Sequence, residues 1–415
     1  NHSQSIKIGD WNIHLNYTNI NTLINVNNTV YVGTKSGLFL YDNDDNSLTS
    51  FSKLDGLNSL NISALDYNTD LKALLIGYAD GNIDIMQDGQ IVNIPEIYLA
   101  SIIGEKKVNN IFIDGNLAYV SCSFGLVIIN LEKREIKETC YFENNGLNSE
   151  VYQAHVFDEE INTDVDFFLA NKIFVATNNG LFYANKNTDL LDYENWENDS
   201  KISFSKLTNM FQSPLYGKEV RQIIGLDLKE AGGKRLMIGT NLNYKNLSLP
   251  LGLKGEYNLF EFNADLSQEL IVFNVLEDVE GGIRNISYNN QVNKILIISP
   301  GIDEKIIIMN DLFEIVSSIK INSINNVDMD FDLSLNCGVV LDDYNSSKRL
   351  FLGDASHGGL ILMHDNTELY FVESISPNGP ADINTGTIFS ANNGIVFSHG
   401  GRTGDWNNSY NYQEI

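Results

Sequence analysis

The residues best suited to hold a ligand lie close together near the end of the chain, in His399-Gly-Gly-Arg402 and the nearby Trp406. An arginine pairs bidentately with a phosphate or carboxylate, a tryptophan stacks on a sugar face, and the histidine adds a hydrogen-bond donor. The glycines between them let a ligand approach the backbone. We therefore expect a ligand site formed by His399, Arg402 and Trp406, and the competing interpretation is a tight turn.

The other polar constellations indicate structure more than catalysis. With 54 acidic residues in the chain, clusters such as Asp158-Glu-Glu160 follow from composition, and alternating carboxylates on a strand lie on one solvated face. The sequence has no Gly-x-Ser-x-Gly elbow, and its six histidines show no His-x-x-x-His spacing. We predict a protein that is not an enzyme and that uses no cofactor and no transition metal.

Two further patterns leave alternatives open. The segment Asp42-Asn-Asp-Asp-Asn-Ser47 has oxygen donors at alternate positions, as calcium loops do. It lacks the downstream glutamate of an EF-hand, and a turn between strands favours Asn and Asp in any case. Trp11, Trp196 and Trp406 can each stack on a sugar, although packing in the core is the commoner role of a tryptophan.

Composition limits the class of partner. The chain has 415 residues, 27 basic against 54 acidic, for a net charge of −27, so most of its surface repels nucleic acid and anionic membranes. No apolar run approaches the length of a membrane span. We expect Cys122, Cys140 and Cys337 to be buried free thiols, because the first two fall two strands apart in one sheet. The start, Asn1-His-Ser-Gln-Ser, resembles the end left by a removed signal peptide, which predicts a secreted chain.

A glycine-anchored hairpin recurs along the chain and must position any site. Gly33 and Gly37 recur 44 positions later as Gly77 and Gly81, and a third copy contains Gly125, another 44 positions on. Later copies have wider spacing, the first of them because of an acidic insertion at Phe157 to Asp166. Seven complete hairpins occur by about residue 365. A repeat of 40 to 50 residues with short apolar strands is typical of a β-propeller with four-stranded blades.

One unit shows how the strands are expected to run. In the first unit, apolar and alternating segments predict strands at residues 21–26, 29–34, 38–42 and 48–53. Gly37 and Gly81 fall at the turn between the second and third strands, where we expect a positive φ or a close backbone. The small residues at 33, 77, 121, 176 and 239 should face crowded neighbours. The left-over segment Trp11 to Leu15 is predicted to close the ring against residues 360–369.

Two of the six prolines lie in Ser376-Pro-Asn-Gly-Pro380, which predicts a linker. The expected organisation is therefore a first seven-bladed β-propeller over residues 1–376 and a linker over 377–380. Residues 381–415, in which the strand pattern resumes, are expected to begin a second propeller. The predicted fold class is all-β.

Particular segments also carry a resemblance to a known family. The hairpins, read as Val-Gly-Thr-x-x-Gly-Leu-Phe, are similar to the two-component-regulator propeller repeat. Three further segments resemble, more narrowly, the PorZ-like components of the type IX secretion system. They are Gly9-Asp-Trp11 through Tyr17, the Tyr-x-Asp-Gly-Asn-Ile-Asp run at residues 78–84, and the segment from Pro377 to Trp406. The similarity covers residues 9–197 and 377–406, whereas residues 200–345 match only as generic blades.

This resemblance implies a cell-surface protein, on the outer membrane exterior of a Gram-negative bacterium, that works as a scaffold in the secretion attachment complex. There it would help to deliver anionic lipopolysaccharide to the sortase. The resemblance assigns no ligand contact to any residue. Two alternatives remain: the extracytoplasmic sensor propeller of a hybrid two-component regulator, and a propeller glycan lyase or hydrolase, which would cluster carboxylates and a basic residue at one channel mouth.

Overall fold

The structure, a computed structural model, describes most of the chain up to residue 377 and short segments after it. The described residues are 15–144, 147–157, 171–198, 218–228, 233–242, 259–262, 271–273, 284–299, 305–310, 315–321, 333–344, 347–365, 368–377, 385–391, 394–399, 401–402 and 408–409.

Four-stranded antiparallel sheets dominate this part of the chain, and in each of them the strands pair in chain order. Each such sheet is a blade, named here by its strands. The first four blades are β1 (Ile20–Val26), β2 (Thr29–Thr34), β3 (Leu38–Asp42) and β4 (Leu48–Phe51); β5 (Ile62–Asn68), β6 (Ala73–Tyr78), β7 (Ile83–Gln87) and β8 (Gln90–Ile94); β9 (Val108–Asp114), β10 (Leu117–Cys122), β11 (Gly125–Asn130) and β12 (Glu135–Cys140); and β15 (Val151–Phe157), β16 (Lys172–Thr177), β17 (Gly180–Asn185) and β18 (Glu197–Asn198). The later sheets are β19 (Lys218–Leu228), β20 (Gly233–Leu242), β21 (Leu259–Phe262) and β22 (Ile271–Phe273); β23 (Asn285–Asn289), β24 (Lys294–Ser299), β25 (Lys305–Asn310) and β26 (Ile315–Lys320); and β27 (Leu335–Tyr344), β28 (Ser347–Asp354), β29 (Gly358–Asp365) and β30 (Glu368–Ile375).

Shorter elements lie between and after the blades. They are the 3-10 turns η1 (Lys53–Asp55) and η2 (Tyr193–Asn195), the single-turn helix α1 (Glu96–Leu99), and the hairpins β13 (Glu143–Asn144) with β14 (Leu147–Asn148), β31 (Thr385–Ala391) with β32 (Gly394–His399), and β33 (Gly401–Arg402) with β34 (Asn408–Ser409).

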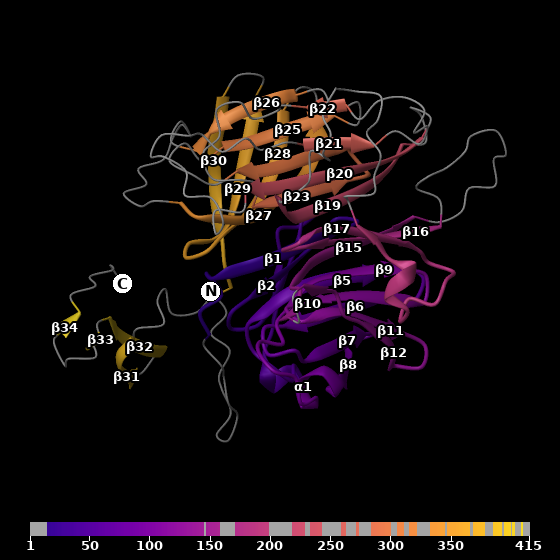
Figure 1. Ribbon diagram of the computed structural model, residues 1–415. Coiled ribbons are helices and arrows are strands. Elements are labelled where there is room, and N and C mark those ends of the chain that lie inside the picture. The colour runs from indigo at the N-terminus through magenta and orange to yellow at the C-terminus, as the bar shows by residue number, and fades with distance from the viewer. Residues whose placement is uncertain are drawn as a thin grey trace.

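The first strands of the blades form the inside of the molecule. Each contacts the first strand of the next blade along the chain, and β27 contacts β1. Figure 1 shows this meeting of the two ends, with β1 in indigo beside β27 in orange. The sheets therefore surround a central axis as a closed ring, and the predicted all-β propeller is confirmed.

The predicted number of seven blades is matched only in part, and the predicted second propeller is not shown by the described residues. Six blades are described with their side chains, whereas the sheet β19–β22 is described almost entirely by its backbone pairing. Beyond Ile375, the described residues form only two two-stranded hairpins and show no second propeller. The expected boundary at 377–380 lies almost entirely outside the described residues, so the division into domains stays a prediction.

Neighbouring blades interlock through a small residue on the second strand. A Cβ placed on Gly33 would lie 2.5 Å from Ile62 Cγ2 of the next blade, and one on Gly77 would lie 2.5 Å from Val108 Cγ1. The equivalent Ser121 and Ala176 are fully buried. A larger side chain at these positions would push apart two packed sheets. The expectation of crowded neighbours is thus confirmed for these four positions, while the side chain environment at residue 239 is not described.

The two glycine turns behave as predicted, each in its own way. Gly81 has a φ of +89°, a conformation that favours glycine, and a Cβ there would meet Lys106 at 2.8 Å. Gly37 keeps an ordinary φ, but its Cβ would collide with the backbone oxygen of Phe51. Both positions therefore require the absence of a side chain.

The ring closes through the same interlock that joins the other blades. A Cβ on Gly353 of the last blade would lie 2.6 Å from Ile20 Cγ2 of the first. The Asn336 amide donates to the Ile20 carbonyl at 2.8 Å, and the Gly358 N–H donates to the Thr18 carbonyl at 2.9 Å. Of the predicted closing segment 11–15, only Leu15 is described; it is not in a strand and packs against this closing cluster. Closure by strand pairing of residues 11–14 remains outside the described part.

Candidate functional site

The sequence-predicted cluster lies after the propeller. His399 ends β32 and Arg402 ends β33, where their backbones pair with Thr385 and Asn408. The side chains of His399 and Arg402 are not described, and Trp406 lies outside the described residues. The structure therefore does not test whether these three residues meet, and this site stays a prediction.

The other sequence candidates have structural partners. In the segment 42–47, Asp42 accepts the Asp44 N–H and Asp45 accepts the Ser47 N–H, both at 2.9 Å, as turn residues do. In the part of the chain that the structure describes, no group of three or more His, Cys, Asp or Glu residues is arranged to hold a metal. Trp196 is buried, donates its indole N–H to the Leu190 carbonyl at 2.9 Å, and packs edge-on against Phe142. The three cysteines are free and buried, as predicted.

The Tyr78-to-Asp84 motif forms a buried structural network. The fully buried Asp84 carboxylate accepts hydrogen bonds from the Tyr78 hydroxyl at 2.6 Å, from the backbone N–H and side-chain amide of Asn58, and from the Asn93 amide. Burial and the adjacent carboxylate raise the pKa of Tyr78. The motif thus fixes the Gly56-Leu57-Asn58 connection to the second blade, and its role is to hold the fold.

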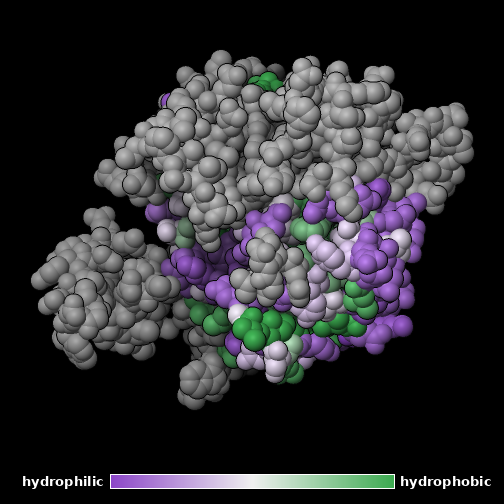
Figure 2. All heavy atoms as spheres, in the orientation of Figure 1, coloured by the Kyte–Doolittle hydropathy of each residue, from purple (hydrophilic) through white to green (hydrophobic). Residues whose placement is uncertain are grey.

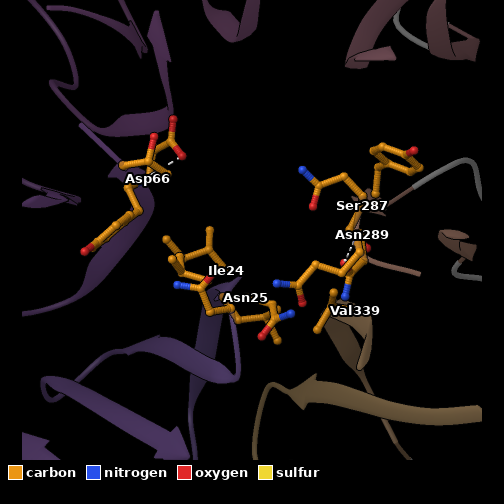
Figure 3. Close-up of a pocket in the computed structure, with 14 residues that line it drawn as sticks. Ile24, Asn25, Asp66, Ser287, Asn289 and Val339 are labelled. Atoms are coloured by element: carbon orange, nitrogen blue, oxygen red, sulfur yellow. Dashed lines mark hydrogen bonds between the residues drawn. The ribbon is translucent and has the colours of Figure 1, made fainter. Parts of the chain in front are cut away.

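The candidate site is a pocket at one mouth of the central channel. Its volume is about 370 Å³, and residues of β1, β5, β23 and β27 line it. Figure 3 shows Asp66 on one wall, Ser287 and Asn289 on the opposite wall, and Ile24 and Asn25 between them. It is here named the channel-mouth pocket. Because β27 and β1 meet only at ring closure, both ends of the propeller contribute to it.

A shared register position brings these side chains to the channel. Ile24, Asp66, Ser287 and Val339 pair with the equivalent residues of their second strands, Tyr31, Leu75, Leu296 and Phe351. The equivalent residues on β9 and β15 are Phe112 and His155, whose ring centroids are 4.3 Å apart.

Turns rich in asparagine form the rim of the pocket. Asn27 and Asn293 adopt positive φ values of 53° and 51° in the turns that follow β1 and β23, a conformation that asparagine tolerates better than most residues. Among these turn residues, Asn27, Asn290 and Gln291 line the pocket. These asparagines look like ordinary turn residues in the sequence, and only ring closure brings the turns after residues 26 and 289 together.

Most polar groups of the opposite wall are held by the protein. The Asn289 amide donates to the Val340 carbonyl at 2.7 Å and accepts from the Gln291 N–H at 2.9 Å. The Ser287 hydroxyl donates to the Gly338 carbonyl at 2.6 Å. These bonds tie β23 to β27 and fix the wall. Asn25 differs, because its amide oxygen is buried and accepts no hydrogen bond from the described residues.

Asp66 is the one carboxylic acid among the residues that line the pocket. Its carboxylate accepts the N–H of Tyr67 and the N–H of Ile113 in the next blade, both at 2.8 Å. Burial raises the pKa of Asp66 to about 7, although these two hydrogen bonds oppose the shift. None of the fourteen residues that line the pocket is basic. The polar groups of the pocket are therefore amides, hydroxyls and one carboxyl group whose pKa is raised.

The opposite end of the strands has a different surface. Each first strand runs from the connection with the preceding blade to a turn on the same face of the ring as the pocket. The connections between blades therefore lie on the opposite face. They expose apolar side chains of Leu54, Leu60, Tyr98, Leu99, Ile103 and Tyr141, named here the connection face. Figure 2 shows green, apolar residues on the surface of the first blades, the indigo and purple sheets of Figure 1.

Comparison with known proteins finds a family that matches the first four blades. Residues 30–197, from β2 to β18, match the family described as "TSS9, PorZ, N-terminal beta-propeller domain". The resemblance to PorZ-like type IX secretion components, seen in the sequence motifs, is thereby confirmed. No curated protein matches the chain.

Two solved structures are similar to the chain. One is PorZ of Porphyromonas gingivalis, described as an essential bacterial surface component of the type-IX secretion system, at 14% identity and a TM-score of 0.42. That match covers 94% of this chain, and this chain spans 57% of the length of that one. The other is Chaetomium thermophilum Raptor, at 10% identity and a TM-score of 0.53, covering 86% of this chain and 29% of Raptor. The likeness to Raptor is one of fold.

Proposed function

We propose that this PorZ-like chain is a non-catalytic binding and scaffold component of the type IX secretion attachment complex. In this proposal it acts at the outer surface of the cell and helps to deliver anionic lipopolysaccharide to the sortase. The observation that carries the proposal is the family match over residues 30–197, which spans the first four blades almost completely.

The chemistry of the pocket supports a binding role. A general acid or base must reach the reacting atoms of a substrate. Both oxygens of Asp66 are already engaged by backbone N–H groups, at 2.8 Å each, and the other lining residues include no carboxylic acid, histidine, lysine or cysteine. No helix in the described residues is long and apolar enough to cross a membrane. The proposed surface location rests on the family match.

The anionic part of a lipopolysaccharide needs a cationic partner, which the channel-mouth pocket does not offer. We therefore assign the phosphate or carboxylate contact to a different part of the protein. The predicted cluster of His399, Arg402 and Trp406 remains the candidate for it.

The role in secretion is tested by deleting the gene in the bacterium that encodes it. We expect cargo proteins with the C-terminal secretion signal to stay unprocessed inside the cell, and the wild-type gene supplied in trans to restore their export. Co-purification from the complemented strain should recover the sortase with the tagged protein. Normal cargo export in the deletion strain would refute the proposal.

The same strains separate the proposal from the sensor alternative. If the chain belonged to a hybrid two-component regulator, deletion would change transcription of a small set of genes and leave the processing of existing cargo unaffected. Purified anionic lipopolysaccharide provides the ligand arm, because an Arg402→Ala, Trp406→Ala double variant with unchanged melting temperature should bind it more weakly than wild type.

A further inference from the structure

The channel-mouth pocket has the dimensions of a small-molecule site. Its volume of about 370 Å³ is within the range of roughly 300–1,000 Å³ usual for such sites. It is built from strands of four blades. Hydrogen bonds that Asn289 and Ser287 donate to the next blade, and one that Asp66 accepts from the blade after its own, hold its walls. A ligand would therefore enter a preformed cavity, and little binding free energy would be lost in ordering its walls.

The lining combines two chemistries in similar amounts. Asn25, Asn27, Asn290 and Gln291 supply amides, and hydroxyl groups come from Tyr67, Tyr288 and other lining residues. Between them lie the apolar side chains of Leu23, Ile24, Val26 and Val339. A sugar ring presents hydroxyl groups at its edge and C–H groups on its faces, so it can use both kinds of surface.

The charge of the pocket selects against ionic ligands. An anion would find no Lys, Arg or His among the lining residues and would be repelled by the Asp66 carboxylate whenever that group is ionised. A cation would find a single carboxylate whose two oxygens already accept backbone N–H groups. An uncharged ligand is not repelled by the Asp66 carboxylate and needs no partner of opposite charge.

Asn25 supplies an observation that the fold alone does not explain. Its amide oxygen is buried and accepts no hydrogen bond among the described residues, although buried acceptors are nearly always satisfied. Asn25 lies on the wall between Asp66 and Asn289 in Figure 3. This oxygen is covered by protein atoms, so a hydroxyl group in the pocket would become its donor only after a rotation of the Asn25 amide turns the oxygen toward the cavity.

From these observations we infer that the channel-mouth pocket binds a neutral sugar residue, held by the amides of its rim and by Asn25. The inference concerns the pocket alone. It goes beyond the proposed secretion role, which can fail or hold independently.

The test uses the purified chain and a panel of uncharged methyl glycosides of glucose, galactose, mannose and N-acetylglucosamine, observed by saturation-transfer NMR. Glucuronate and glucosamine serve as the charged counterparts, and a capped uncharged tetrapeptide as the competing class of ligand. We expect at least one neutral glycoside to bind and its charged counterparts to bind less. Binding of the tetrapeptide alone, of the charged sugars alone, or of none of these probes would overturn the inference.

Three variants locate the binding. Asn25→Leu removes the amide at nearly constant volume and Gln291→Ala shortens the rim, and each should weaken glycoside binding by about tenfold or more. Asn187→Leu, at an exposed turn residue that does not line the pocket, is the matched control and should leave binding unchanged. Because Asn25→Leu also removes an unsatisfied buried acceptor, its melting temperature should stay the same or rise while binding falls. Full binding by the Asn25→Leu and Gln291→Ala variants would place the sugar elsewhere and overturn the inference.

Discussion

The two faces of the propeller differ in both chemistry and origin. The channel-mouth pocket combines amide and hydroxyl groups with apolar side chains, and it forms where blades from both ends of the chain meet. The connection face is apolar, and it forms from loops that follow one another along the chain, so each loop depends only on its own two blades. The comparison indicates that the ring gives one face to a small polar ligand and leaves the other for contacts made by consecutive blades.

The largest expected effect concerns the support of the connection face. Asp84→Ala leaves the Tyr78 hydroxyl and the donors of Asn58 and Asn93 without their acceptor in a buried site. We expect a loss of about 3 kcal/mol in the free energy of unfolding, measured by urea denaturation. Asp44→Ala on an exposed turn should change it by less than about 0.5 kcal/mol. Equal effects of the two changes would show that the network does not hold this connection.

A second change breaks the packing below the same face. Gly81→Val places a branched side chain at a positive φ and against Lys106 and Ile97, which belong to the connection that carries Leu99 and Ile103. The free energy of unfolding should fall by about 2 kcal/mol. Proteolysis should become faster within residues 95–107. A variant that keeps wild-type stability would contradict the close packing at Gly81.

At the polar mouth, Asp66 predicts a dependence on pH. Its pKa is about 7 in the folded protein and about 3.9 in an unfolded chain, so the unfolded state loses its proton first as pH rises. Stability contributed by this group is therefore present below about pH 4 and lost between pH 4 and 7. After allowance for partial solvent exposure we expect about 1–2 kcal/mol. Asp66→Asn should reduce the fall in stability over this interval; an unchanged slope would contradict the burial argument.

Replacing one polar residue of the same pocket by an apolar one should stabilise the protein. Asn25→Leu removes a buried oxygen that has no partner among the described residues, so the free energy of unfolding should rise by about 1 kcal/mol. Thermal denaturation in the absence of sugars measures this. A clear destabilisation would mean that Asn25 has a structural partner, and the contrast between the two faces would then rest on the other amides.

The smallest effect is expected at the connection face itself. Ile103 is fully exposed and Leu99 is 70% exposed, so Ile103→Ser and Leu99→Ser should each change the free energy of unfolding by less than about 0.5 kcal/mol. If the connection face mediates self-association, size-exclusion chromatography should show less of it for the variants than for wild type. A large loss of stability would show that these side chains pack against the fold.

Local features of the fold could be read from the sequence, because each repeat carries its own turn and strand signals. The expected strands 29–34 and 38–42 match β2 and β3, and 21–26 differs from β1 by one residue. The roles of Gly33, Gly37, Gly77 and Gly81 also followed from local spacing.

The pocket could not be read in this way. Asn25 and Asn289 resemble ordinary strand-end and turn residues, and nothing near either of them indicates the other. Their meeting depends on the interlock of Ile20 with Gly353, a contact between distant parts of the chain. The predicted cluster at His399 drew attention because its residues are adjacent in sequence, whereas the pocket combines residues that only the closed ring brings together.

The closing contact between Ile20 and Gly353 also has a consequence for how the protein matures. The connection face can form as soon as the first blades fold, but the channel-mouth pocket cannot exist until the last blade docks on the first. Long-range contacts of this kind form late, because the chain must first lose the entropy of a large loop. A molecule that binds in the pocket would therefore recognise only finished copies, and by mass action it would draw half-assembled ones toward completion.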